Sequence, residues 1–204
     1  MQEYNLPTSR LYGAIMTTMM RERLLSEAEY LMREKGYSAF SYADLSKIVG
    51  ITKASIHHHF PTKDILGEEV VIQALADTQR MFEQIEASEK TAAQRIAAYV
   101  DLFAQSHRAS LLPLCCALSA ETANLPSNIT DQTSRYFDMQ IEWLMSVVSR
   151  GIAAGEIAPQ GEASDLALMI INLCEGASVV ARATARPEVF SSSLKYIKLL
   201  LNTR

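Results

Sequence analysis

The sequence has little cysteine, proline and glycine. Of its 204 residues, three are cysteine, six are proline and eight are glycine. Two of the cysteines are adjacent (Cys115, Cys116) and the third is distant (Cys174), so they cannot form the disulfide framework that stabilises small secreted domains. We therefore expect a protein of a reducing compartment, the cytoplasm.

Long apolar runs are also missing. No uninterrupted run approaches the roughly 18 residues that a helix needs to cross a bilayer. The first residues, which include Glu3, Asn5, Pro7 and Arg10, do not form the apolar region of a signal peptide. We expect no membrane partner. The hydrophobic content of 49% is nevertheless high enough to bury a good core, which excludes a disordered chain.

The sequence has no overall excess of positive charge, since its formal net charge is −4. The charge is distributed unevenly: residues 1–65 hold eight Lys/Arg and seven Asp/Glu, a net of +1, and the rest of the chain is acidic. Such a weak positive charge gives little electrostatic attraction to DNA. Any affinity for DNA must therefore come from a few placed cations and from the pairing of two copies.

Apolar residues recur at helical spacing along most of the chain. From about residue 18 to residue 35 they fall on one face of a helix, at Leu24, Leu25, Ala28, Leu31 and Met32. No stretch of useful length alternates as a strand does, and no internal repeat is present. These patterns predict an all-α fold of about nine helices: a flexible arm over 1–17, a three-helix unit over 18–65 and a larger helical domain over 66–204.

Residues 42–60 predict two short helices joined by a tight turn. Leu45, Ile48 and Val49 mark the inner face of the first helix, and Gly50 supplies a turn that needs a positive φ. Ser41 and Thr52 are predicted N-caps of the two helices. The stretch is therefore interpreted as a helix-turn-helix.

The second of these helices has one apolar face and one polar face. If Ile51 and Ile56 point inward, the outward residues are small, polar or cationic: Thr52, Lys53, Ala54, His57 and His58. Such a surface suits the major groove of DNA. We add Ser41 and Tyr42, at the start of the first helix of the motif, as further candidate DNA contacts.

Residues from about 20 to 66 resemble the DNA-binding domain of the TetR family of transcriptional repressors. The resemblance rests on the spacing of Arg21-Glu22-Arg23-Leu24-Leu25, Gly36-Tyr37, Leu45-Ser46, Gly50-Ile51, His57-His58-His59-Phe60 and Lys63. It implies that Thr52, Lys53 and His58 lie in the major groove, and that Lys63 contacts a phosphate. Where relatives often carry a phosphate-binding tyrosine, this chain has His57, so the contact could depend on pH.

The rest of the chain fits the family by the number and order of its helices. Residues 162–185 are apolar on most sides, which predicts that a partner chain covers part of this helix. We expect a homodimer formed through the last two helices. Residues that could line a small-molecule pocket between the helices are Phe103, His107, Cys116, Phe137, Trp143, Asn172 and Glu175. They favour an apolar or aromatic effector.

Two other kinds of site are suggested by particular residues. Three consecutive histidines on a helix point about 100° apart and cannot converge on one metal ion, so we predict neither a metal nor a cofactor. Cys115 and Cys116 could form a redox switch, although buried cysteines usually act as small hydrophobic residues. A catalytic use of these thiols with His107 lacks an oxyanion loop and an orienting acid, so we expect no enzyme.

The sequence thus predicts a ligand-responsive repressor that binds a palindromic operator as a homodimer. A thiol-based redox regulator and an activator of the same fold remain the alternatives.

Overall fold

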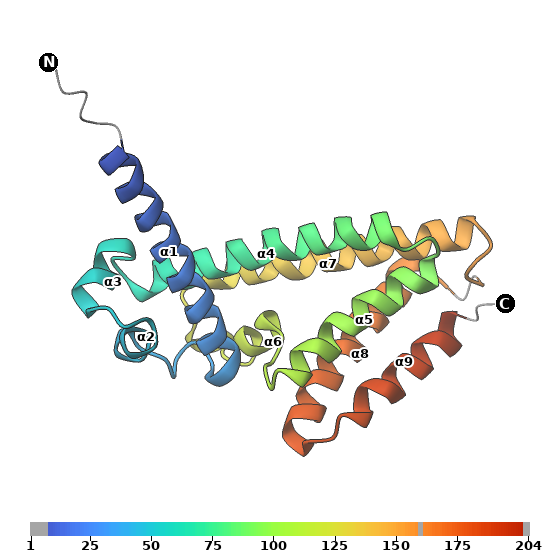
Figure 1. Ribbon diagram of the computed structural model, residues 1–204. Helices are drawn as coiled ribbons and strands as arrows, with labels where there is room; N and C mark the ends of the chain where they lie inside the picture. The colour runs from blue at the N-terminus through green and yellow to red at the C-terminus, as the bar shows by residue number, and fades with distance from the viewer. Residues whose placement is uncertain (1–7, 159–160, 202–204) are drawn as a thin grey trace, which may run out of the picture.

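The computed structural model describes residues 8–158 and 161–201, and every regular element within them is helical (Figure 1). The α-helices are α1 (Thr8–Lys35), α2 (Tyr42–Val49), α3 (Lys53–His59), α4 (Lys63–Ser88), α5 (Ala92–Arg108), α6 (Leu114–Ser119), α7 (Ser127–Ala153), α8 (Ala163–Thr184) and α9 (Glu188–Leu201). A 3-10 turn, Thr122–Asn124, follows α6. The predicted all-α fold is confirmed.

The N-terminal segment corrects the expected flexible arm. Residues 1–7 lie outside the described residues, but α1 already begins at Thr8 and continues without a break to Lys35. The first turns of α1 project beyond the other helices (Figure 1), and Tyr12 and Met19 are largely exposed. A packed helix can be extended residue by residue without the cost of new nucleation, so this segment needs no apolar face to be helical.

The two predicted N-caps, Ser41 and Thr52, begin their helices. Ser41 caps α2 in a capping box with Asp44, whereas Thr52 caps α3 and Thr62 caps α4. Gly50 ends α2 in the left-handed conformation, with φ of 77°, which a residue without a Cβ adopts at no steric cost. These local signals fix the angle between α2 and α3.

Two apolar cores hold the molecule together. The first joins α1, α2 and α3 to the first half of α4, and it also takes in Leu114, Leu118 and Ile129 from α6 and α7. The second lies among α4, α5, α7, α8 and α9. The boundary expected at residue 65 falls in the first turn of α4, whose next turns place Leu66 and Val70 in the first core. Helix α4 therefore runs from one core into the other.

Helix α8 is unusually apolar. By length and composition alone it is the one helix among the described residues that could cross a membrane, with 22 residues and a mean hydropathy of 1.5. Asp165, Glu175 and Arg182 interrupt the run. A core helix of a folded domain passes the same test, and 39% of the apolar window is buried here. Four large apolar side chains of α8, Leu168, Met169, Val179 and Val180, are exposed in a single chain.

Candidate DNA-binding surface and effector pocket

Helix α3 is anchored by its apolar side and exposed on the other. Ile56 is fully buried, and Phe60 is buried just past the end of the helix. The outward residues predicted from the sequence, Lys53, Ala54 and His58, are exposed together with Ser55. The arrangement leaves one face of α3 free to enter a groove.

The candidates at the start of α2 hold the motif together. Tyr42 is buried, and its hydroxyl donates a 2.9 Å hydrogen bond to the carbonyl of Phe60 at the end of α3. The Ser41 hydroxyl lies 2.8 Å from the Asp44 carboxylate within the capping box. Ile48, expected on the inner face of α2, is 40% exposed. Tyr42 therefore helps to position the end of α3, and a DNA contact by Tyr42 or Ser41 stays a prediction.

Lys63 lies where α4 meets the three-helix unit. Its Nζ donates a 2.6 Å hydrogen bond to the carbonyl of Tyr37 and sits 4.3 Å and 4.5 Å from the ring centroids of Tyr37 and Phe40. Burial lowers the pKa of this amine. An ammonium group has three donors, so its bond to Tyr37 is compatible with a phosphate contact. Lys63 thus has a packing role that the sequence did not reveal.

His57 makes a backbone contact on the exposed side of α3. Its Nδ1 lies 3.0 Å from the carbonyl of Pro61, and its ring packs edgewise against Tyr42. If Nδ1 donates to that carbonyl, Nε2 can donate to a phosphate only when the ring is protonated. Within the described ranges, no three His, Cys, Asp or Glu side chains gather as metal ligands would.

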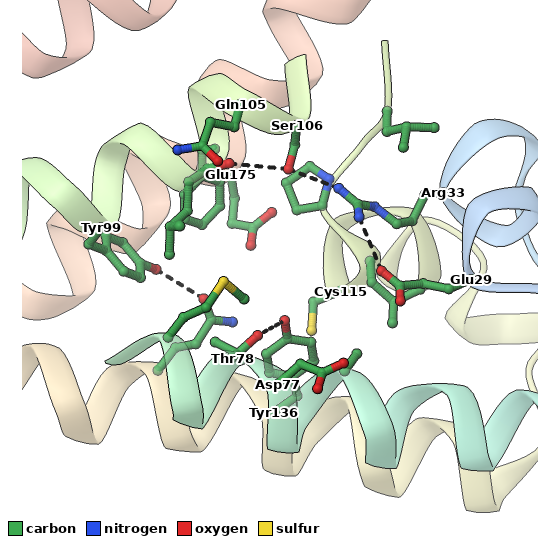
Figure 2. A pocket seen from close by; sticks show the side chains of 18 of the residues that line it. Glu29, Arg33, Asp77, Thr78, Tyr99, Gln105, Ser106, Cys115, Tyr136 and Glu175 are labelled. Carbon is green, nitrogen blue, oxygen red and sulfur yellow. Dashed lines mark hydrogen bonds and ion pairs between the residues drawn. The ribbon is translucent and has the colours of Figure 1, made fainter. Parts of the chain in front are cut away.

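A cavity of about 410 Å³ lies between the two cores (Figure 2). Its apolar wall includes the aromatic residues Phe82, Tyr99 and Phe103. Two hydrogen-bonded pairs also face it: Thr78 with the Tyr136 hydroxyl at 2.5 Å, and the Tyr99 hydroxyl donating to Gln140 Oε1 at 3.2 Å. The volume and mixed lining are typical of small-molecule sites.

Glu175 enters this cavity from α8 as a charged group in an apolar setting. Figure 2 shows its carboxylate extending into the pocket. Both oxygens are buried, and neither has a hydrogen-bond partner among the described residues. Burial raises the pKa of Glu175 to about 7. The nearby Cys116 thiol offsets part of this rise, although the thiol is not within hydrogen-bonding geometry of the carboxylate. Such an unpaired buried carboxylate calls for an explanation.

Phe103 and Glu175 are the two predicted pocket residues that line the cavity. The neighbour of the predicted Cys116, Cys115, lines it instead. Trp143 stacks on Phe82 behind the wall, with ring centroids 4.2 Å apart. The other candidates lie outside the lining: Phe137 packs against the second core, His107 contacts the Phe190 ring, and Asn172 is exposed on α8.

Two residues that sequence reasoning missed come from α1. Glu29 and Arg33 line the cavity, and an ion pair of 3.1 Å joins them. The guanidinium of Arg33 also donates to the carbonyl of Leu112 at 2.9 Å and to the Ser106 hydroxyl at 2.9 Å. Because the i, i+4 spacing of an exposed helical ion pair looks the same in the sequence, no signal marked this pair.

The C-terminal end of α1 is also held from the other side. Arg182 of α8 donates to the carbonyls of Arg33 at 3.2 Å, Ser110 at 3.3 Å and Glu34. A cation at the end of a helix also interacts favourably with its dipole. Just beyond α1, the Ser38 amide donates to the Glu121 carboxylate at 2.8 Å. Residues of α8 and of the segment after α6 therefore hold the C-terminal end of α1 in place.

The thiols show no sign of activation. Burial is the main cause that raises the pKa of Cys115 well above its usual value, that of Cys116 to about 12, and that of Cys174 further still. A reactive cysteine needs a lowered pKa and access to solvent. The redox alternative is therefore not favoured.

A three-helix unit with an exposed second motif helix, joined through α4 to a helical domain with a cavity, defines a helix-turn-helix DNA-binding regulator. The sequence model of the family described as bacterial regulatory proteins, tetR family, matches residues 24–70. This match, the similar regulators and the similar solved structures together support a transcriptional regulator of the TetR family. Members of this family are DNA-binding proteins rather than enzymes.

Relatives cover nearly the whole chain. The transcriptional repressor NemR of Escherichia coli is 25% identical over 188 residues, which are 90% of this chain and 94% of NemR. The regulator CymR of Pseudomonas putida is 26% identical over 162 residues, 77% of this chain and 76% of CymR. A solved TetR-family regulator from Agrobacterium tumefaciens shares 28% identity and a TM-score of 0.86, covering 92% of this chain and 98% of its own.

Proposed function

We propose that the protein is a ligand-responsive repressor that binds a palindromic operator as a homodimer. The observation that carries this proposal is that Glu29 and Arg33 of α1 line the cavity. A small molecule in the cavity can therefore contact α1, the helix on which the helix-turn-helix packs. The ligand shifts the equilibrium between the DNA-bound and released states by the difference between its affinities for the two states. NemR, to which this chain is similar, is a transcriptional repressor, and this similarity supports repression rather than activation.

The surface of α8 and α9 supports a homodimer. Large apolar side chains on it are exposed: Leu168, Met169, Val179, Val180, Tyr196 and Leu199. On α8 they form two adjacent pairs, 168–169 and 179–180, that lie about three helical turns apart and therefore share one face. Gly176 lies on that face, and a Cβ placed there would meet no described atom within 4 Å, so a partner helix can approach closely. The same faces of two copies would pack around a two-fold axis.

Pairing about a two-fold axis would also compensate for the low positive charge of each DNA-binding unit. Two copies of α3 would enter successive major grooves about 34 Å apart on an inverted repeat. Each unit alone has few cations, and pairing adds the second site at a high effective concentration. The proposal therefore ties operator affinity to dimer formation.

The test compares an exposed valine on α8 with an exposed isoleucine on α4. Val180→Asp buries a charge in the proposed interface, whereas Ile72→Asp alters a similarly exposed apolar residue on α4 (49% and 45% exposed). We expect Val180→Asp to be monomeric in light scattering and to lose at least about tenfold in affinity for a selected operator. Ile72→Asp should remain dimeric. A dimeric Val180→Asp protein with unchanged DNA affinity contradicts the proposed interface.

Repression is tested with a reporter whose promoter contains the selected operator. Expression of the wild-type protein should lower reporter output, and Val180→Asp should not. An increase in output with the wild-type protein would identify an activator.

A further inference from the structure

Glu175 is an acid without a counter-ion inside an aromatic cavity. The other acids of the lining have partners: Glu29 pairs with Arg33 and Asp77 pairs with Arg80. Both oxygens of Glu175 are buried and unpartnered among the described residues. An ionised carboxylate in an apolar site is stable only when a charge or several donors compensate it.

No cation of the lining is free to compensate it. Arg33 is the only basic residue among the described residues that line the cavity. Its guanidinium already contacts Glu29, Leu112 and Ser106, and Figure 2 shows it directed to Glu29 and Ser106. An anionic ligand would therefore meet an uncompensated carboxylate, and the charge of Arg33 is already paired with Glu29. A ligand with a positive charge would supply the missing one.

The walls suit the rest of such a ligand. Phe82, Tyr99 and Phe103 line the cavity, and aromatic faces attract both apolar groups and organic cations. The hydroxyls of Thr78 and Tyr136 bond to each other at 2.5 Å, so one proton of the pair is left to donate, and neither group carries the positive charge that an anion would need. The cavity thus suits a ligand with an apolar body against the rings and a basic group at Glu175.

We infer that the effector is an amphipathic organic cation, an ammonium group carried on an aromatic or aliphatic body, and that Glu175 binds the ammonium. This inference rests on the proposed function, because it names the class of molecule that the regulatory pocket takes. Pairing with the cation also favours the ionised form of Glu175, whose pKa is raised by burial in the free protein. Effector binding should therefore strengthen as the pH rises from about 5.5 to 8, within the range where an aliphatic amine stays charged.

Three probes with one skeleton test the charge preference: 4-phenylbutylamine, 4-phenylbutan-1-ol and 4-phenylbutyrate. Calorimetric titration of the full-length protein at pH 8 should show the amine binding at least about tenfold more tightly than the alcohol, and the acid most weakly. Shorter and longer phenylalkylamines adjust the length. Equal affinity for amine and alcohol, tighter binding of the acid, or no saturable binding by any amine of the series would overturn the inference.

Variants assign the preference to Glu175. Glu175→Gln keeps the shape of the side chain and should bring the amine-to-alcohol ratio close to one, with the affinity for the alcohol unchanged. Asp77→Asn removes an already paired acid of the same lining and should leave the ratio as in the wild type. A ratio that survives in Glu175→Gln, judged folded by circular dichroism, would place the cation elsewhere. The rise of amine affinity with pH in the wild-type protein is an independent readout that needs no variant.

A separate measurement distinguishes failure of the inference from failure of the proposed function. Operator release is followed by fluorescence anisotropy with each probe. Amine binding that leaves the operator bound would contradict ligand-responsive repression and keep the cation site. Release by an anionic molecule that competes with the amine would contradict the cation preference and keep the proposed function.

Discussion

Replacement of Glu175 by glutamine should change how the stability of the protein depends on pH. Burial raises the pKa of Glu175 from 4.5 to about 7 in the folded chain. For an acid with a raised pKa, the folded state binds the proton more tightly than the unfolded state, so the free energy of unfolding falls as the pH rises between those two values. At 1.36 kcal/mol per pKa unit, the loss between pH 5 and pH 8 is about 2.5 kcal/mol.

The assay is urea unfolding of ligand-free protein at pH 5 and at pH 8. One protein concentration is used because the proposed dimer would link stability to concentration. Glutamine does not titrate, so the variant should gain about 2.5 kcal/mol relative to the wild type between the two pH values. Glu142→Gln, at an exposed glutamate of α7, is the matched control and should follow the wild type. Parallel pH profiles for the wild-type and Glu175→Gln proteins would refute the argument that this carboxylate is buried without a partner.

The remaining predictions concern the DNA-binding unit and its attachment. Lys63→Ala should lower the free energy of unfolding by about 2 kcal/mol, because a hydrogen bond and two cation–π contacts are lost. It should also reduce the slope of log operator affinity against log salt concentration by about one. If neither value changes, Lys63 has neither the packing role nor the phosphate contact. Arg182→Ala should bind the amine probe normally yet release the operator less completely, whereas full release would show that this contact with α1 is dispensable.

The helix-turn-helix was accessible to sequence reasoning because its signals are local. Ser41, Gly50 and Thr52 act on their own or adjacent turns, and the caps and the positive φ follow from residue chemistry. The packing role of Tyr42 could not be predicted because its partner, the carbonyl of Phe60, lies 18 residues away. The start of α1 was missed because helix continuation needs no sequence pattern of its own.

The pocket could be predicted only in part because its walls come from distant segments. Glu175 was found as a polar residue in an apolar helix, a signal that requires an explanation wherever the helix packs. Glu29, Arg33 and Tyr136 carried no comparable signal, since the contribution of each depends on how α1 and α7 pack against α4 and α5. Asn172 gave the same signal as Glu175, yet α8 turns it to the outer face.

The most direct test of the central claim is the stoichiometry and symmetry of the DNA complex. Full-length protein is used to select duplexes from a random pool, and the complex with the selected sequence is weighed by analytical ultracentrifugation. The account predicts an inverted repeat with half-sites about one helical turn apart, occupied by two chains and released by the amine probe. A single asymmetric site occupied by one chain, or no selected sequence at all, would contradict it.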